Sequence, residues 1–185
     1  ESDAWHQALQ AVSGRPMPEE VAAQRGRLVD AYVDGHKYVF GKRAVVYGEA
    51  DLAIGLCAFL AEIGVRPVLC ATGGREKGFA EAVSTVCRDI LPEPPACRTG
   101  MDFYDLQHLA PEFAPDLLVG HSKGYPLARQ WDIPLLRVGF PLHDRFGGQR
   151  VRHVDYAGAQ ELFDRLVNCC IERKQDRSDV GYGYL

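Results

Sequence analysis

Histidine, serine, lysine and aspartate side chains gather in two glycine-containing segments, each of which follows a short apolar run. The first segment contains His121, Ser122 and Lys123, and the second contains His143 and Asp144. A serine, a histidine and an aspartate linked by hydrogen bonds can perform nucleophilic catalysis. Serine is also a common helix cap, however, and histidine and lysine are ordinary loop residues. We therefore expect no catalytic residue in the chain. The alternative is a small-molecule enzyme whose active site these two segments form.

The second segment is the most informative stretch of the sequence. An apolar run from Pro134 to Val138 predicts a buried strand, and Gly139-Phe140-Pro141 then forces a loop. Open α/β sheets place ligands and partners beyond the carboxyl ends of their strands. We expect Asp144 and Arg145 to orient this loop through buried polar contacts, which makes it a structural loop formed by Gly139, Phe140, Pro141, Asp144 and Arg145.

Two other loops stand where α/β folds often bind a phosphate group, and we consider each in turn. A dinucleotide site needs closely spaced glycines after the first strand, but Gly48-Glu49-Ala50-Asp51 puts two carboxylates there, whose charge would repel a pyrophosphate. Thr72-Gly73-Gly74-Arg75 is a better candidate anion nest. Glycine pairs between strands and helices are mostly turns, so we expect no bound cofactor at either loop.

Asp30 and Asp34 form the candidate metal site. They are four residues apart on an expected helix and therefore share a face. Two carboxylates are too few to hold a hard cation alone, so a metal here needs other oxygen ligands to complete its shell. A solvated helix face is the alternative interpretation.

Composition excludes several classes of protein. The chain has 185 residues, 46% of them hydrophobic, and a net charge of −4, which argues against a nucleic-acid-binding surface. Its apolar runs are far shorter than a membrane span. Six cysteines lack the paired spacing of metal-cluster ligands and indicate a reducing, cytoplasmic location: Cys57, Cys70, Cys87, Cys97, Cys169 and Cys170. The sequence starts at Glu1, which suggests a piece of a longer polypeptide.

The order of expected elements predicts the fold class. Five short strands are expected at 43–47, 67–70, 96–98, 117–120 and 135–138, with helices at 50–63, 77–90, 102–109 and 125–131 between them. Two helices precede this alternation, at 3–12 and 18–34, and an amphipathic helix over 159–171 follows it. Such alternation predicts an α/β fold, a doubly wound and mainly parallel five-stranded sheet of the Rossmann-like kind. We divide the chain into a helical lead-in (1–36), the α/β domain (37–173) and a polar, then aromatic, tail (174–185).

Three long strings in the sequence resemble one protein family. Residues 13–68, Leu117–Gly124 (LLVGHSKG) and Pro134–Arg150 (PLLRVGFPLHDRFGGQR) are similar to the carboxy-terminal domain of β-type subunits in the nitrogenase component-1 family. The resemblance implies three Rossmann-like domains per subunit, of which this chain would be the third, and a role in nitrogen fixation within an oxidoreductase family.

The resemblance also implies partners and cofactors. It implies an α/β heterotetramer with an α-type subunit and a second β-type subunit, served by a nucleotide-dependent iron protein. An iron–sulfur cluster or an iron–molybdenum cofactor precursor would belong to the full-length complex and not to this piece. The histidine that holds the cofactor in α-type chains is replaced here by the stretch Arg137–Pro141. Asp30 and Asp34 match a pair that contributes to a cation site between two β subunits.

Two members of the family share this domain. They are the β-like chain of the scaffold that assembles the iron–molybdenum cofactor and the β chain of the molybdenum–iron protein itself. The two-glycine loop GFPLHDRFGGQR favours the scaffold chain, and the β chain of the mature enzyme is the alternative.

Overall fold

A five-stranded sheet forms the centre of the computed structural model, which describes residues 2–180. All five strands are parallel, in the order β3-β2-β1-β4-β5. Their bounds are β1 Arg43–Tyr47, β2 Arg66–Ala71, β3 Ala96–Arg98, β4 Leu117–Gly120 and β5 Leu135–Arg137. Apolar residues fill the three central strands because helices cover both of their faces. The α/β, doubly wound prediction is confirmed, and the sheet is wholly parallel where we expected it to be mainly so.

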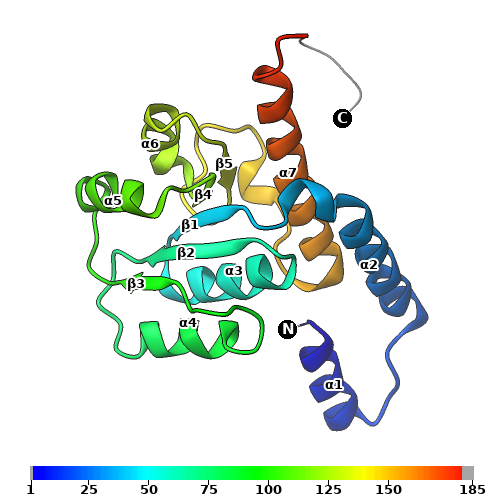
Figure 1. The fold of residues 1–185 in the computed structure, drawn as a ribbon. Helices are drawn as coiled ribbons and strands as arrows, with labels where there is room; N and C mark the ends of the chain where they lie inside the picture. The colour runs from blue at the N-terminus through cyan, green and yellow to red at the C-terminus, as the bar shows by residue number, and fades with distance from the viewer. Residues whose placement is uncertain (1, 181–185) are drawn as a thin grey trace.

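Helices pack on both faces of this sheet (Figure 1). The α-helices are α1 Ser2–Ser13, α2 Glu19–Val39, α3 Ala50–Glu62, α4 Phe79–Cys87, α5 Phe103–Leu109, α6 Tyr125–Gln130 and α7 Asp155–Asp176. Short 3-10 turns lie at Ala110–Phe113, Ser122–Gly124 and Gly148–Arg150. The side chains of β4 alternate between the two faces of the sheet. Leu117 and Val119 face α2, α3, α4 and α7, whereas Leu118 faces α5 and α6.

The second helix is longer than the sequence predicted and is part of the core. We expected it to end at Asp34, but α2 continues to Val39, whose side chain is fully buried. The reason is Gly35: a Cβ there would lie 2.6 Å from Cε1 of Phe163, so the missing side chain lets α2 approach α7 closely. Tyr32 packs edge-on against the same ring, with centroids 4.9 Å apart. The division at residue 36 thus falls within a continuous helix.

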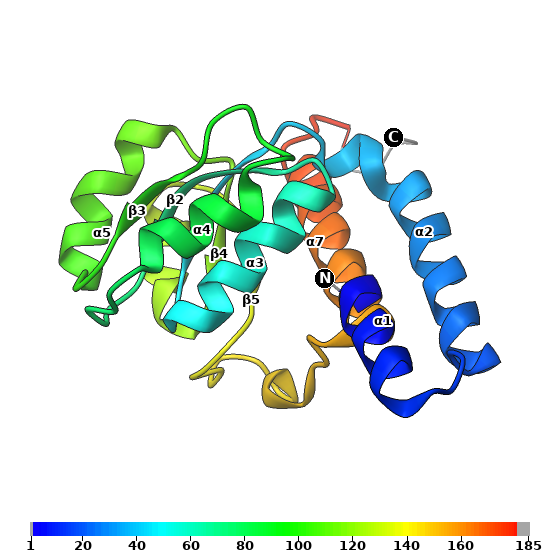
Figure 2. The same ribbon diagram turned by 90° about the horizontal axis from the view of Figure 1, so that it is seen from below.

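Polar contacts attach α1 to the start of α7. The Nε2 atom of His6 lies 2.9 Å from Oδ1 of Asp155, and its ring stacks on Tyr156. Asp3 accepts hydrogen bonds from the Tyr156 hydroxyl at 2.7 Å and from Arg25 of α2 at 2.8 and 2.9 Å. Together α1, α2 and α7 form one end of the molecule (Figure 2).

The last helix also exceeds its expected bounds. We expected it over 159–171 and a polar tail from residue 174, but α7 begins at Asp155 and ends at Asp176. The side chain of Arg173 hydrogen-bonds to the carbonyl oxygen of Asp132 at 2.7 Å, which anchors the helix end to the loop before β5. Val180 is exposed, and the rest of the expected aromatic tail, 181–185, lies outside the described residues.

Candidate functional site

A buried polar cluster connects the two glycine-containing segments. The hydroxyl of Ser122 donates a hydrogen bond to Oδ1 of Asp144, and Nε of Arg137 donates to Oδ2 at 2.8 Å. Only 13% of the Arg137 side chain and 22% of the Asp144 side chain are exposed. The hydrogen bond from Arg137 is the main reason that the pKa of Asp144 falls to about 2. Asp144 is therefore a permanent anion that holds the loop after β5 against the loop after β4.

This cluster is not a catalytic triad. The segment Gly120-His121-Ser122-Lys123-Gly124 has the G-x-S-x-G pattern of the hydrolase turn that carries the nucleophilic serine. In that turn the serine is exposed, but Ser122 is buried and is bonded directly to the carboxylate. His143 contributes only its backbone N–H, 3.2 Å from the Ser122 hydroxyl oxygen, so no imidazole stands between serine and aspartate.

The loop that the sequence singled out is fixed by backbone contacts as well. The Ser122 N–H donates to the carbonyl oxygen of Pro141 at 3.1 Å. Gly139 has φ = 81°, and a Cβ there would lie 2.6 Å from the Leu52 side chain, so both conformation and space require glycine. Phe140 is 69% exposed although it lies in this well-held loop. Contacts of Gly139, Pro141 and Asp144 thus hold the loop, and the exposed Arg145 side chain lies 2.7 Å from the Asp144 carbonyl oxygen and 3.8 Å from its carboxylate.

A second feature is a small crevice of about 130 Å³ at the carboxyl ends of β1, β2 and β4. Tyr47 is its central wall, and the tyrosine hydroxyl donates a hydrogen bond to the carbonyl oxygen of His121. Burial raises the pKa of Tyr47, and burial together with Lys123 and His143 lowers the pKa of His121. Both side chains are therefore neutral at pH 7. The sequence analysis did not identify Tyr47, because a tyrosine at the end of an apolar strand carries no distinctive pattern.

Neither of the two loops considered for phosphate binding, 48–51 and 72–75, has the geometry of an anion site. The N–H of Thr72 donates to the Arg98 carbonyl oxygen at 3.0 Å, and the N–H of Gly74 donates to the Thr72 hydroxyl at 3.2 Å. These amides are thus used within the protein, which favours the turn interpretation over a nest. Glu49 lies before α3 and lines the crevice, where its charge opposes an anionic ligand.

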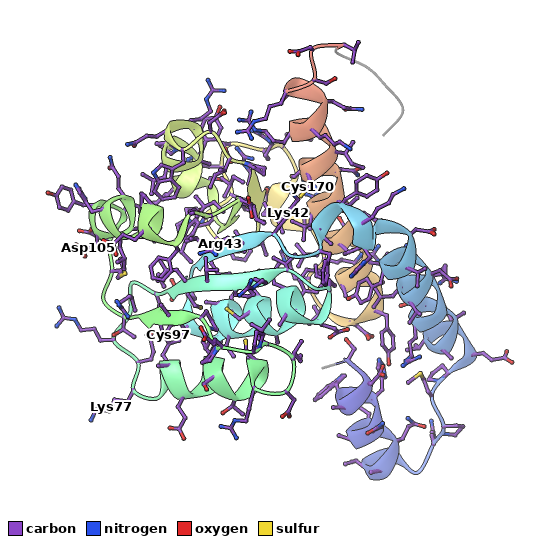
Figure 3. All side chains as sticks on the ribbon, in the orientation of Figure 1. Lys42, Arg43, Lys77, Cys97, Asp105 and Cys170 are labelled. Atoms are coloured by element: carbon purple, nitrogen blue, oxygen red, sulfur yellow. The ribbon has the colours of Figure 1, made fainter. Side chains whose placement is uncertain are left out.

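The possible metal ligands are scattered. Asp30 and Asp34 lie on the exposed face of α2, and no group of three histidine, cysteine, aspartate or glutamate residues could hold a metal ion within residues 2–180. The six cysteines come from five elements, with Cys169 and Cys170 both on α7, and Figure 3 shows Cys97 on β3 well apart from Cys170. Burial raises the pKa of both thiols. The cation at Asp30 and Asp34 stays a prediction, because its remaining ligands would come from another chain.

Fold and site together define a Rossmann-like structural domain with a rigid polar loop. The family model described as "Nitrogenase component 1 type Oxidoreductase" matches residues 1–171. The chain therefore belongs to the nitrogenase component-1 family, as its sequence motifs suggested, and its relatives fit a β-type subunit. No helix among the described residues is long and apolar enough to cross a membrane.

Curated relatives match over nearly the whole chain. The molybdenum–iron protein beta chain of Rippkaea orientalis is 34% identical over 180 residues, which is 97% of this chain and 35% of that protein. The molybdenum–iron protein beta chain of Azotobacter vinelandii is 32% identical over 191 residues, covering 96% of this chain and 35% of the relative. The iron–iron protein beta chain of Rhodobacter capsulatus is 32% identical over 169 residues. The chain thus spans only about a third of the length of these relatives.

The fold has a close counterpart among solved structures. A chain of "Nitrogenase Cp1 at pH 6.5" superposes with a TM-score of 0.93 and 26% identity, covering all of this chain and 40% of the solved one. A chain of "Nitrogenase Cp1 at pH 5" superposes with a TM-score of 0.61 at 11% identity, which shows a shared fold alone.

The iron–molybdenum cofactor implied by the family does not fit this domain. After β5, Arg137 is paired with Asp144, and Val138 to Pro141 offer no side-chain ligand. The thiols of Cys57, Cys70 and Cys87 are fully buried among apolar side chains. The neighbouring Cys70 thiol and burial raise the pKa of Cys57, and burial raises the pKa of Cys87, which makes these two thiols poor ligands because metal clusters bind thiolates.

Proposed function

We propose that this chain is the carboxy-terminal domain of the β chain of a nitrogenase component-1 enzyme. The observation that carries the proposal is its match, over 97% of its length, to a protein named as a molybdenum–iron protein beta chain. The names of these relatives support the mature enzyme, which was our alternative, better than the cofactor-assembly scaffold that the two-glycine loop favoured. The loop was a weak guide because its glycines serve local backbone geometry: Gly147 has φ = 75°, and Gly148 packs against Leu142.

In this function the domain supplies a rigid α/β block and a surface for subunit contact. Large apolar side chains remain exposed on three separate elements of the domain. Trp5 on α1 is 62% exposed, Val33 on α2 is 74% exposed and Phe146 in the loop after β5 is fully exposed. Exposed apolar groups of this size are typical of surfaces that bury themselves against a partner. The partners we propose are an α-type subunit, a second β-type subunit and a nucleotide-dependent iron protein, in a cytoplasmic heterotetramer.

The experiment uses the full-length protein that contains this domain, expressed with its α-type subunit. With the iron protein, a nucleotide and a reductant, the mature enzyme reduces dinitrogen catalytically. A scaffold would instead transfer a bound cluster precursor to an enzyme that lacks its cofactor. Sustained dinitrogen reduction supports the proposal, and cluster transfer without turnover would return the chain to the scaffold class.

The aspartate pair gives a test of the subunit contact. We expect Asp30→Asn with Asp34→Asn to preserve the fold, because both side chains are exposed. We expect the double variant to form the tetramer less completely, and calcium to strengthen assembly of the wild type only. Sedimentation of both proteins with and without a chelator measures this. Identical assembly in all four conditions would make the pair an ordinary solvated helix face.

A further inference from the structure

The crevice beside Tyr47 has no role in the proposed function, yet it has the features of a binding site. It lies at the ends of β1 and β4, from which the chain continues to β2 on one side of the sheet and to β5 on the other. Open α/β sheets bind ligands at such a position. Its lining includes Tyr47, Glu49, Thr72, Asp102, Phe103 and His121, which come from the ends of three strands and the start of α5. Side chains separated by up to 74 positions in the sequence therefore converge on about 130 Å³ of space.

The aromatic walls of the crevice are rigid. The ring of Tyr47 lies 5.4 Å from that of Phe103 and 5.0 Å from that of His121, and the rings meet edge to face. Two glycines make room for the tyrosine: a Cβ on Gly120 or on Gly124 would lie 2.5 or 2.6 Å from Cζ of Tyr47. Walls fixed before binding reduce the entropy lost when a ligand enters.

The charges at the rim select for a cation. Glu49 and Asp102 are both exposed carboxylates, and neither forms an ion pair among residues 2–180. Asp102 uses Oδ1 to accept the Asp105 N–H at 2.9 Å, which leaves Oδ2 for a ligand. Aromatic faces also attract cations. Two positive charges oppose this selection: Lys123 acts on the adjacent His121, and the Arg75 side chain lies beside Gly100.

The available acceptors indicate the kind of cation. A hard metal ion needs about six to eight oxygen ligands, and the crevice offers carboxylates on two residues only. Two carboxylates at the rim of a crevice with aromatic walls suit a flat group with several N–H donors. A guanidinium has five such donors in one plane, pairs with carboxylates and stacks on aromatic rings.

We propose that the crevice formed by Tyr47, Phe103, His121, Glu49 and Asp102 binds a guanidinium group. The group belongs either to a small molecule or to an arginine side chain of a partner protein, and the chemistry of recognition is the same in both cases.

Ligand-observed nuclear magnetic resonance on the full-length protein tests the proposal. The probes are methylguanidinium chloride, its neutral analogue N-methylurea, and the peptide acetyl-Gly-Arg-Gly-amide, all at one ionic strength. We expect saturable binding of at least one cationic probe and none of N-methylurea. A peptide that binds at least tenfold more tightly than methylguanidinium indicates an arginine side chain as the source, and the reverse order indicates a small molecule.

Carboxylate variants locate the binding. Glu49→Gln and Asp102→Asn should each weaken binding of the cationic probe at least tenfold. The asparagine in Asp102→Asn keeps a side-chain oxygen that can accept the hydrogen bond at the start of α5. Asp51→Asn is the matched control, since Asp51 is an exposed carboxylate that does not line the crevice, and it should change nothing. Unchanged circular dichroism establishes that each variant is folded. No saturable binding, or equal binding to all four proteins, would overturn the proposal.

Discussion

Asp144 offers the sharpest test of how the loop after β5 is held. In the variant Asp144→Ala the carboxylate disappears, and with it the acceptor for the Ser122 hydroxyl and for Nε of Arg137. The guanidinium of Arg137 would remain mostly buried, with the Leu135 carbonyl oxygen at 3.4 Å and the Tyr125 ring as its remaining neighbours. A buried cation that loses its anion is among the more damaging changes in a protein interior.

Two lines of reasoning give the expected loss of folding stability in the Asp144→Ala variant. Removing one member of a fully buried pair destabilises by about 3–5 kcal/mol, and leaving a single polar group without its partner by about 1–3 kcal/mol. Because 22% of the Asp144 side chain is exposed, the lower part of this range applies. Independently, a pKa of about 2 in the folded protein against the ordinary value of 3.8 corresponds to about 2 kcal/mol at neutral pH. We therefore expect a loss of about 2–3 kcal/mol.

Urea unfolding of the 185-residue chain, followed by circular dichroism, measures this loss. Ser122→Ala should lose about 1–2 kcal/mol, since it removes the hydrogen bond to Asp144 and the acceptor of the His143 N–H but leaves the Arg137 pair intact. Asp89→Ala is the matched control, because Asp89 is an exposed aspartate on the surface, and it should change stability by less than about 0.5 kcal/mol. An Asp144→Ala chain as stable as the Asp89→Ala control would refute the structural role of the loop. Hydrolase activity that disappears with Asp144 would favour the enzyme alternative instead.

Three further predictions follow from particular contacts. The stabilisation from Asp144, whose pKa is lowered, is complete above about pH 4 and is lost as the pH falls toward 2, so acid titration should erase the difference between wild type and Asp144→Ala; a difference that persists at pH 2 contradicts the assignment. Gly35→Ala should destabilise by about 1–2 kcal/mol, because crowding against Phe163 exceeds the gain in helix propensity, whereas Gly26→Ala on the same helix, with open space around it, should stabilise by up to about 1 kcal/mol; equal effects in urea unfolding would show that α2 does not pack as described. The purified chain should be colourless and free of iron, and stoichiometric iron with a charge-transfer band after anaerobic reconstitution would disprove this.

Much of the fold was predictable because strand and helix patterns alternate along the chain. All five strands were predicted, including the weak one at Ala96–Arg98, which pairs with β2 although its sequence is barely apolar. The errors concern helix ends. Helix α2 passes through Gly35, a residue with poor helix propensity, because its contact with Phe163 outweighs that propensity. This contact joins residues 128 positions apart in the sequence, so no local pattern could show it.

The candidate site was only partly predictable. The sequence identified the loop from Gly139 and its aspartate, because glycine, proline and charged residues are visible signals. It grouped Ser122, His143 and Asp144 as a possible catalytic set, whereas the structure pairs Ser122 with Asp144 and leaves the histidine ring out. The pairing of Asp144 with Arg137 depends on how the loop after β5 folds back, and the aromatic crevice around Tyr47 depends on contacts between neighbouring strands; composition and spacing encode neither.

Sedimentation velocity of the full-length protein, expressed together with its α-type subunit, tests the central claim most directly. The claim is that this domain belongs to a β-type subunit whose surfaces serve assembly. We predict a stable complex with equal amounts of the two subunits and the mass of a heterotetramer. We also predict weaker assembly when Trp5 and Val33, exposed on α1 and α2, are replaced by serine. A full-length protein that sediments alone in the presence of the α-type subunit would contradict the account.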